Sequence, residues 1–396
     1  MIKKSSFLFV STFVYLLFLP NFLFNLFPSN SVGIYSGIVF IPFIFFNIFK
    51  LINKKISLNI LILIFIIIFS IVTHLAISFS FNFHLIQHDF IHKALFSIPL
   101  VVIFLITAYL FAYRINKINF ISPLDEKPFI YIYLFLCLIL VLSLFFNDFF
   151  LTSKNSIIFS EPSKFYSIFS LITLSLILSY NDKPFIIVVL LITYFLTNLF
   201  FYSFLSIFYL IFFLFCLRIN FLLKMLVIPI SIIFLSFFIL NNEYFYSRIF
   251  DPNNLSHAVF YYYYNFMLDN LLSSNFIGFG FQSLGYQDSF SFARGVNNIE
   301  YNRYDGSFLL AKIITDFGIF GIFFVLYYIY KCTRLFLIIF NSYRSKMHNF
   351  SIIDLFFISS FLLFFIDIFF RSYGYFTSTS FLFLASFLYL KNKRLI

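Results

Sequence analysis

The chain has 396 residues, of which 62% are hydrophobic and only 10% are charged, and its formal net charge is +11. A mean hydropathy of +1.01 excludes an ordinary soluble domain. Apolar runs of about twenty residues recur, each able to cross roughly 30 Å of hydrocarbon as a helix, and the alternating strands of a membrane barrel are absent. The composition predicts an all-α polytopic integral membrane protein, a single transmembrane domain over residues 1–396.

Twelve membrane-spanning helices are expected in chain order. Lys3 and Lys4 precede the first apolar run, which is too long for the core of a signal peptide and is therefore expected to remain as a helix. The expected spans are 7–26, 32–49, 58–80, 94–113, 129–146, 165–180, two within 185–217, 225–240, 308–330, 350–370 and 376–390.

The apolar run 185–217 is expected to contain two helices joined near residues 197–203. A single helix would be about 50 Å long, too much for one crossing. With two helices and an inner N-terminus, eighteen of the twenty-six basic residues lie on the inner side, whereas one helix would move nine of them outside. Both termini are then cytoplasmic, and the large loop 241–307 is extracytoplasmic.

The net positive charge is explained by this topology, and no basic face or motif indicates a nucleic-acid partner. The three cysteines give no disulfide or metal framework. His84, His88 and His92 recur at every fourth residue before the fourth span and would share one helix face, which is a spacing that suits a metal. The alternative is an interfacial turn with solvated imidazoles, and no cofactor is expected. The lone His74 is expected to be a packed or hydrogen-bonded residue.

The large loop is expected to contain a helix between residues 251 and 275, with Asp251 as its N-cap and Pro252 in its first turn. An apolar face at helical spacing is predicted from Phe260, Tyr264, Met267, Leu268 and Leu271. Two interpretations stay open: a helix that lies on the bilayer over a lipid-facing site, and a plain packing helix.

Arg248, Arg294 and Arg303 are the only basic residues of this loop. A guanidinium binds phosphate oxygens in a bidentate fork, so these arginines are candidates for binding an anionic substrate. The alternative is that they pair with Asp288, Glu300 and Asp305 and hold the loop together.

Ionisable residues also occur inside two of the predicted spans. Lys312 and Asp316 lie one helical turn apart, and they form either a mutual ion pair or the lining of a cavity. Arg371 stands at the outer end of the eleventh span, where it is either an anchor at the membrane surface or another anion contact, with Asp367 as its expected partner.

Three short segments resemble conserved motifs of the O-antigen polymerase and ligase superfamily. They are Asn275–Phe281 (NFIGFGF), Asp305–Leu309 (DGSFL) and Asp316–Gly321 (DFGIFG), in the family's order after a long loop. Members of the ligase branch have a histidine where Asp305 stands, so the chain is more similar to the polymerase (Wzy-type) branch. It departs from many relatives in lacking an arginine in the turn 197–203, and Lys154 or Lys164 are the possible substitutes.

The resemblance implies an oligosaccharide repeat unit polymerase of the bacterial inner membrane. Such an enzyme moves a growing glycan from undecaprenyl diphosphate onto a new lipid-linked unit, and a chain-length regulator and a flippase are implied as partners. Asp305 is the expected catalytic base, with Glu300 second. The expected diphosphate contacts are Arg248, Arg294, Arg303, Lys312 and Arg371. The alternatives are a flippase for lipid-linked sugars and an O-antigen ligase.

Overall fold

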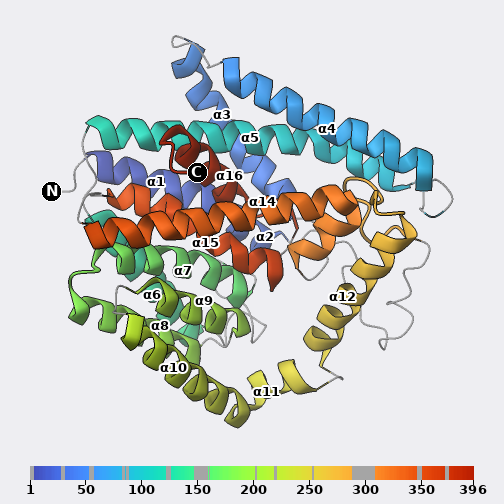
Figure 1. The fold of residues 1–396 in the computed structure, drawn as a ribbon. Coiled ribbons are helices and arrows are strands. Elements are labelled where there is room, and N and C mark those ends of the chain that lie inside the picture. The colour runs from blue at the N-terminus through green and yellow to red at the C-terminus, as the bar shows by residue number, and fades with distance from the viewer. Residues whose placement is uncertain are drawn as a thin grey trace.

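The computed structural model describes most of the chain as helices packed into one bundle (Figure 1). The described residues are 4–27, 32–52, 58–82, 85, 89–121, 126–146, 159, 161–200, 203–217, 221–251, 254–287, 308–345, 350–370 and 374–396. Within these ranges the regular elements are all helices. The all-α prediction is therefore confirmed.

The helices fall at the positions that the apolar runs predict. Before the loop they are α1 (Lys4–Leu17), α2 (Leu19–Leu26), α3 (Val32–Ile52), α4 (Leu58–Asn82), α5 (Asp89–Ile121), α6 (Lys127–Phe146), α7 (Pro162–Ser179), α8 (Pro184–Phe200), α9 (Phe204–Cys216) and α10 (Phe221–Asn241). They continue as α11 (Glu243–Phe250), α12 (Leu255–Ser273), α14 (Leu309–Ser345), α15 (Ile352–Phe369) and α16 (Ser378–Asn392).

Seven of the described helical stretches are long and apolar enough to cross a membrane. They start in α1, α4, α5, α7, α10, α14 and α15, and shorter apolar helices lie between them. The chain is thus an all-α membrane protein, whereas the count of twelve spans stays a prediction.

The helix boundaries agree with one expected feature of the apolar runs and differ from another. The run 185–217 contains two helices, because α8 ends at Phe200 and α9 begins at Phe204. The first expected span is divided into α1 and α2 at Phe18. Pro20 lies in the first turn of α2, where its missing N–H costs no helical hydrogen bond.

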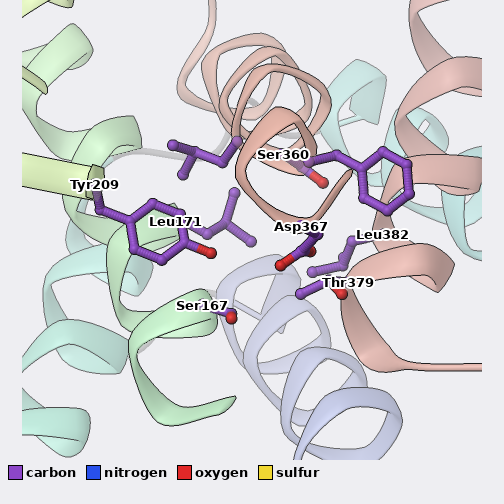
Figure 2. A pocket seen from close by; sticks show the side chains of 9 residues that line it. Ser167, Leu171, Tyr209, Ser360, Asp367, Thr379 and Leu382 are labelled. Atoms are coloured by element: carbon purple, nitrogen blue, oxygen red, sulfur yellow. The ribbon is translucent and has the colours of Figure 1, made fainter. Parts of the chain in front are cut away.

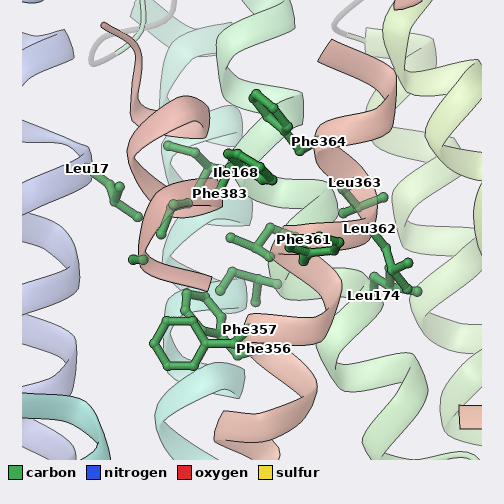
Figure 3. Close-up of a cluster of buried hydrophobic side chains, with 14 of the residues drawn as sticks. Leu17, Ile168, Leu174, Phe356, Phe357, Phe361, Leu362, Leu363, Phe364 and Phe383 are labelled. Carbon is green, nitrogen blue, oxygen red and sulfur yellow. The ribbon is translucent and has the colours of Figure 1, made fainter. Parts of the chain in front are cut away.

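Helix α15 forms the centre of the bundle, with 89% of its apolar span buried. It packs against α7, α14 and α16, and Figure 3 shows its phenylalanines directed at side chains of α7 and α16. The ring of Phe364 stacks on that of Phe383 in α16, with 4.2 Å between their centroids. Helices α4 and α10 are peripheral, with 11% and 7% of their spans buried, so their apolar side chains are left to lipid.

Helix α14 differs from the continuous span expected at 308–330, because its helical backbone is broken at Gly318. The φ and ψ angles there are 56° and −130°, a combination that glycine adopts far more easily than other residues. The carbonyl oxygen of Ile313 lies 2.6 Å from where a Cβ of Gly321 would stand. Eight residues of straight helix span about 12 Å, so the segment 309–317 folds back beside the residues that follow the break.

The N-cap of α12 is Asn254, so the prediction that Asp251 caps this helix is wrong. The side chain of Asn254 accepts a hydrogen bond from the N–H of Ser256 at 3.0 Å. Asp251 instead ends the short helix α11, where its N–H donates to the carbonyl of Ser247. Sequence reasoning missed α11, and with it the helix end that uses Asp251.

The buried face of α12 is also different from the predicted one. It consists of Val259, Tyr263, Phe266, Met267 and Asn270. Of the predicted apolar face only Met267 is buried, whereas Phe260, Tyr264 and Leu268 are exposed. Apolar residues occur almost all round this helix, so periodicity does not identify the face that packs on α14.

We predict that Gly318→Ala destabilises the protein strongly. Its Cβ would stand 2.2 Å from the carbonyl oxygen of Phe276, and a residue with a side chain at this φ costs about 1–3 kcal/mol before the clash is counted. The melting temperature of the detergent-purified protein measures the effect. Gly37→Ala in α3 is the matched control, because its Cβ meets the mobile end of the Leu100 side chain at 3.1 Å. Equal melting temperatures for the two variants would contradict the role of the break.

Candidate functional site

The break in α14 is filled by a tight turn, residues 275–287, which we call the Gly-rich turn. At a break, backbone carbonyls lose the N–H partners that a continuous helix would supply. Here the carbonyl of Thr315 accepts from the N–H of Phe279 at 2.9 Å, and that of Asp316 accepts from the N–H of Gly280 at 2.8 Å. The turn thus replaces the missing helical hydrogen bonds.

Helix α14 also donates a hydrogen bond to the turn. The N–H of Ile319, which starts the second part of α14, donates to the carbonyl of Phe276 at 2.8 Å. Gly278 and Gly318 lie in direct contact, since a Cβ on Gly278 would stand 2.5 Å from the backbone nitrogen of Gly318. The two glycine motifs found in the sequence are therefore two halves of one interlocked structure.

The carboxylate of Asp316 anchors the turn to α14. It is fully buried, and it accepts hydrogen bonds from the N–H groups of Gln282, Ser283 and Leu284 at 2.9, 3.1 and 3.2 Å. The hydroxyls of Ser283 and Tyr375 each add a bond at 3.0 Å. Five hydrogen bonds therefore occupy both oxygens of the carboxylate, and Asp316 stabilises the turn. An ion pair with Lys312, which is one of the two interpretations of the sequence, does not account for these bonds.

Helix α4 presents a polar stripe to the other side of the turn. Ring nitrogen Nε2 of His74 lies 2.9 Å from the carbonyl oxygen of Ile277, and the amide of Asn82 donates to the carbonyl of Gly278 at 3.1 Å. Ser78 lies between them on the same face and is also buried. The stripe explains three polar residues in a largely lipid-exposed helix, and it confirms His74 as a hydrogen-bonded residue.

Lys312 is buried beside this anchor, with 4% of its surface exposed. Its ammonium lies 5.1 Å from the ring centroid of Tyr375 and would stand 3.6 Å from a Cβ on Gly374. It also interacts electrostatically with the Asp316 carboxylate. The Tyr375 ring in turn stacks on Phe281 of the turn. The cluster thus joins α14, the Gly-rich turn and the start of the last helical segment.

Sequence reasoning missed two residues that contribute to this cluster. Tyr375 carries no sequence motif, and only its fold neighbours reveal it. Lys93 in α5 lies with its ammonium 5.3 Å from the ring centroid of Tyr286 in the turn. The predicted topology contained a signal for Lys93, because it places this lysine on the outer side of the membrane, where few lysines are expected. An exception to that bias is a candidate for function.

Arg248, one of the predicted anion contacts, belongs to α11, where its guanidinium stands 4.5 Å from the ring centroid of Tyr244. Helix α11 contacts α12 (Figure 1), whereas the Gly-rich turn follows the C-terminus of α12. Nineteen residues of helix separate α11 from the turn, or roughly 28 Å. The structure therefore places Arg248 away from the Gly-rich turn, and its described contact is with Tyr244 of its own helix.

The other predicted site residues lie outside the described residues. They are Arg294, Glu300, Arg303, Asp305 and Arg371. The structure does fix the ends of the segment that contains the first four: Gln287 closes the Gly-rich turn, and buried Phe308 precedes α14, its ring 4.8 Å from that of Phe260. Both ends of residues 288–307 are thus attached to the α12–α14 pair that carries the cluster.

The proposed histidine metal site is only partly described. His84 and His88 lie outside the described residues, and His92 is an exposed residue in the first turns of α5. Among the described residues no group of three metal-ligating side chains comes together. The three cysteines are free thiols. Lys164, a predicted substitute cation, lies 4.6 Å from the ring centroid of Phe24, and Lys154 is not described.

The described cluster contains two lysines near the Gly-rich turn. The Lys93 ammonium lies beside Tyr286 of the turn, and that of Lys312 lies beside Tyr375, whose ring stacks on Phe281, whereas the oxygens of Asp316 already accept hydrogen bonds. No family of known proteins, curated protein sequence or solved structure matches the chain. Functional reasoning on this chain therefore starts from its own geometry and motifs.

We predict that Asp316→Asn lowers stability by roughly 3 kcal/mol, because an amide leaves buried N–H donors of the turn without an acceptor. Thermal unfolding of the purified protein measures the loss. Tyr375→Phe removes one of the five bonds and should cost about 1 kcal/mol. Asp269→Asn, on the exposed side of α12, is the matched control and should leave the melting temperature unchanged. If Asp316→Asn behaves like that control, the carboxylate does not anchor the turn.

Proposed function

We propose that the chain is an oligosaccharide repeat unit polymerase acting at the extracytoplasmic face of the bacterial inner membrane. One observation supports this proposal above the others: the two glycine motifs through which the sequence resembles O-antigen polymerases are interlocked across the break in α14. Motifs that match by chance would have no reason to meet. Both ends of the polar segment 288–307, which contains the candidate chemical groups, are attached to the α12–α14 pair that carries this junction.

The proposed reaction is glycosyl transfer from a lipid diphosphate. A sugar hydroxyl of the incoming lipid-linked unit attacks the anomeric carbon of the growing chain, and the bond from that carbon to the diphosphate oxygen breaks. Undecaprenyl diphosphate leaves with the bonding electron pair, and the hydroxyl proton passes to the base, for which we propose Asp305 with Glu300 second. Cations stabilise the leaving diphosphate. We assign this role to Arg294, Arg303, Arg371 and Lys312.

The proposal requires twelve spans, cytoplasmic termini and an extracytoplasmic loop 241–307. We predict that a reporter fused after Asn297 reads extracytoplasmic, whereas fusions after Arg344 and after the last residue read cytoplasmic, because basic residues concentrate on the cytoplasmic side. Paired phosphatase and fluorescent-protein fusions measure both states. A cytoplasmic signal at Asn297 would place the loop on the side where nucleotide sugars are available and would remove the reason for a lipid-diphosphate donor.

The surface polysaccharide of a strain that lacks the protein separates the three candidate functions. Loss of a polymerase leaves a single repeat unit on each acceptor. Loss of a ligase leaves no attached chain, and loss of a flippase leaves lipid-linked units on the cytoplasmic side. Chain-length regulators and flippases are the proposed partners, and their loss gives altered length distributions and internal accumulation. Only the first pattern supports the proposal.

In the purified enzyme we predict that Asp305→Asn abolishes polymer formation from lipid-linked repeat units, because an amide cannot accept the hydroxyl proton. General bases contribute about 10²–10⁴-fold in rate, so the loss is far beyond assay error. Release of lipid diphosphate and polymer length are measured together, and the amount of folded protein is the control. Wild-type rates in the variant would exclude Asp305 as the base.

For the arginines we predict that Arg294→Lys or Arg303→Lys lowers the rate by about 10²-fold, because lysine keeps the charge but not the fork that holds a diphosphate. Arg248→Lys is the matched control, since this residue lies in α11, at the opposite end of α12 from the Gly-rich turn. Its described contact is with the Tyr244 ring, which a lysine ammonium can also make, so this variant should keep the wild-type rate. Normal rates in all three variants would show that the arginines hold the loop together and do not bind substrate.

A further inference from the structure

A small cavity lies between α7, α9, α15 and α16, away from the Gly-rich turn (Figure 2). Its volume is about 20 Å³, which is room for one water-sized particle. The lining residues are Ser167, Leu171, Tyr209, Ser360, Leu363, Phe364, Asp367, Thr379 and Leu382. The cavity therefore lies where two parts of the chain meet, α7 and α9 from its middle and α15 and α16 from its C-terminal part.

Every polar group of the lining side chains is an oxygen. Asp367 provides the one carboxylate, and hydroxyls come from Ser167 in α7, Tyr209 in α9, Ser360 in α15 and Thr379 in α16. Asp367 and Ser360 are 4% and 6% exposed. The Thr379 hydroxyl is a hydrogen-bond partner of the Asp367 carboxylate. Figure 2 shows the carboxylate directed into the space between these side chains.

Among the described residues the lining contains no lysine, arginine or histidine that would balance the carboxylate; Arg371, the partner expected from the sequence, lies outside the described residues. A carboxylate within an apolar bundle is costly unless a charge or several donors compensate for it, and such groups commonly mark ion pathways. An empty hole of this kind would also reduce the close packing of the bundle centre. Its lining is polar, so the cavity suits an occupant that interacts with oxygen.

We propose that this cavity binds one monovalent hard cation of the size of sodium. Carboxylate and hydroxyl oxygens are ligands for hard cations, and the absence of nitrogen and sulfur from the lining argues against a transition metal. One carboxylate matches a single positive charge, whereas calcium takes six to eight oxygens and commonly several carboxylates. The inference is independent of the proposed polymerase activity.

A cation at Asp367 would connect the four helices that surround it. The hydroxyls of Ser167, Tyr209 and Thr379 belong to three different helices, so binding would hold these helices against α15. Asp367 and Thr379 stand on either side of the connection that supplies Tyr375 to the Asp316 anchor. The ion therefore stabilises the segment on which the Gly-rich turn depends.

The test measures binding of radioactive sodium-22 to the purified full-length protein, and the melting temperature in sodium chloride against choline chloride at equal ionic strength. We expect about one bound sodium per chain and a higher melting temperature in sodium, because a ligand that binds only the folded state stabilises it. Asp367→Asn should weaken binding by at least about tenfold, as expected for the loss of a charged ligand.

Two further variants make the result decisive. Ser360→Ala removes one hydroxyl from the lining and should weaken sodium binding while leaving the carboxylate in place. Asp354→Asn is the matched control, because this buried acid of the same helix bonds Ser351 and Tyr389 instead of lining the cavity. Three outcomes would overturn the proposal. They are no sodium-22 bound by the wild type, equal binding by Asp367→Asn, and equal stabilisation by choline chloride, each of which would leave only water in the cavity.

Discussion

A broken helix within an apolar bundle must find new partners for its freed backbone groups, and this constraint organises the candidate site. Lipid offers no hydrogen bonds, so irregular backbone is tolerated only where protein surrounds it. At Gly318 the chain meets the constraint by bringing a second irregular segment, the Gly-rich turn, into the gap. Each segment supplies the hydrogen-bonding groups that the other lacks. Neither conformation would be stable alone in this setting.

The same constraint explains why polar residues from distant helices gather at this place. Asp316 accepts hydrogen bonds from three N–H groups of the turn, and α4 supplies His74 and Asn82 to the carbonyls of Ile277 and Gly278. Tyr375 then connects the anchor to the segment before α16. Asp316 belongs to a motif that could be interpreted as catalytic, yet its carboxylate holds the backbone of the turn in place.

The sequence predicts the positions of helices, which depend on local composition. It does not predict features that depend on contacts between distant segments. Apolar runs locate the helices, and the length of the run 185–217 correctly implies the interruption before Phe204. The break at Gly318 could not be predicted in this way. The residues around it are apolar and resemble one continuous span, and the break is stabilised by a turn some forty residues earlier in the sequence. The buried face of α12 was likewise unpredictable, because α14 selects it through contacts such as that of Asn270 with Thr315. The candidate site was predicted only in part, since Lys312 and Asp316 carry charge in a span but Tyr375 has no local signal.

The hydrogen bonds that Asp316 accepts also constrain the proposed chemistry. A general base needs a free lone pair directed at the proton it removes, and both oxygens of this carboxylate already accept bonds from the turn, Ser283 and Tyr375. Asp367 lies among hydroxyls beside a cavity of about 20 Å³, which is too small for a sugar. Neither acid is available to a bulky acceptor. If the chain transfers glycans, the base must come from a group that approaches the cluster from the loop. Asp305 has the shortest connection, since only Gly306 and Ser307 separate it from the buried Phe308 that immediately precedes α14.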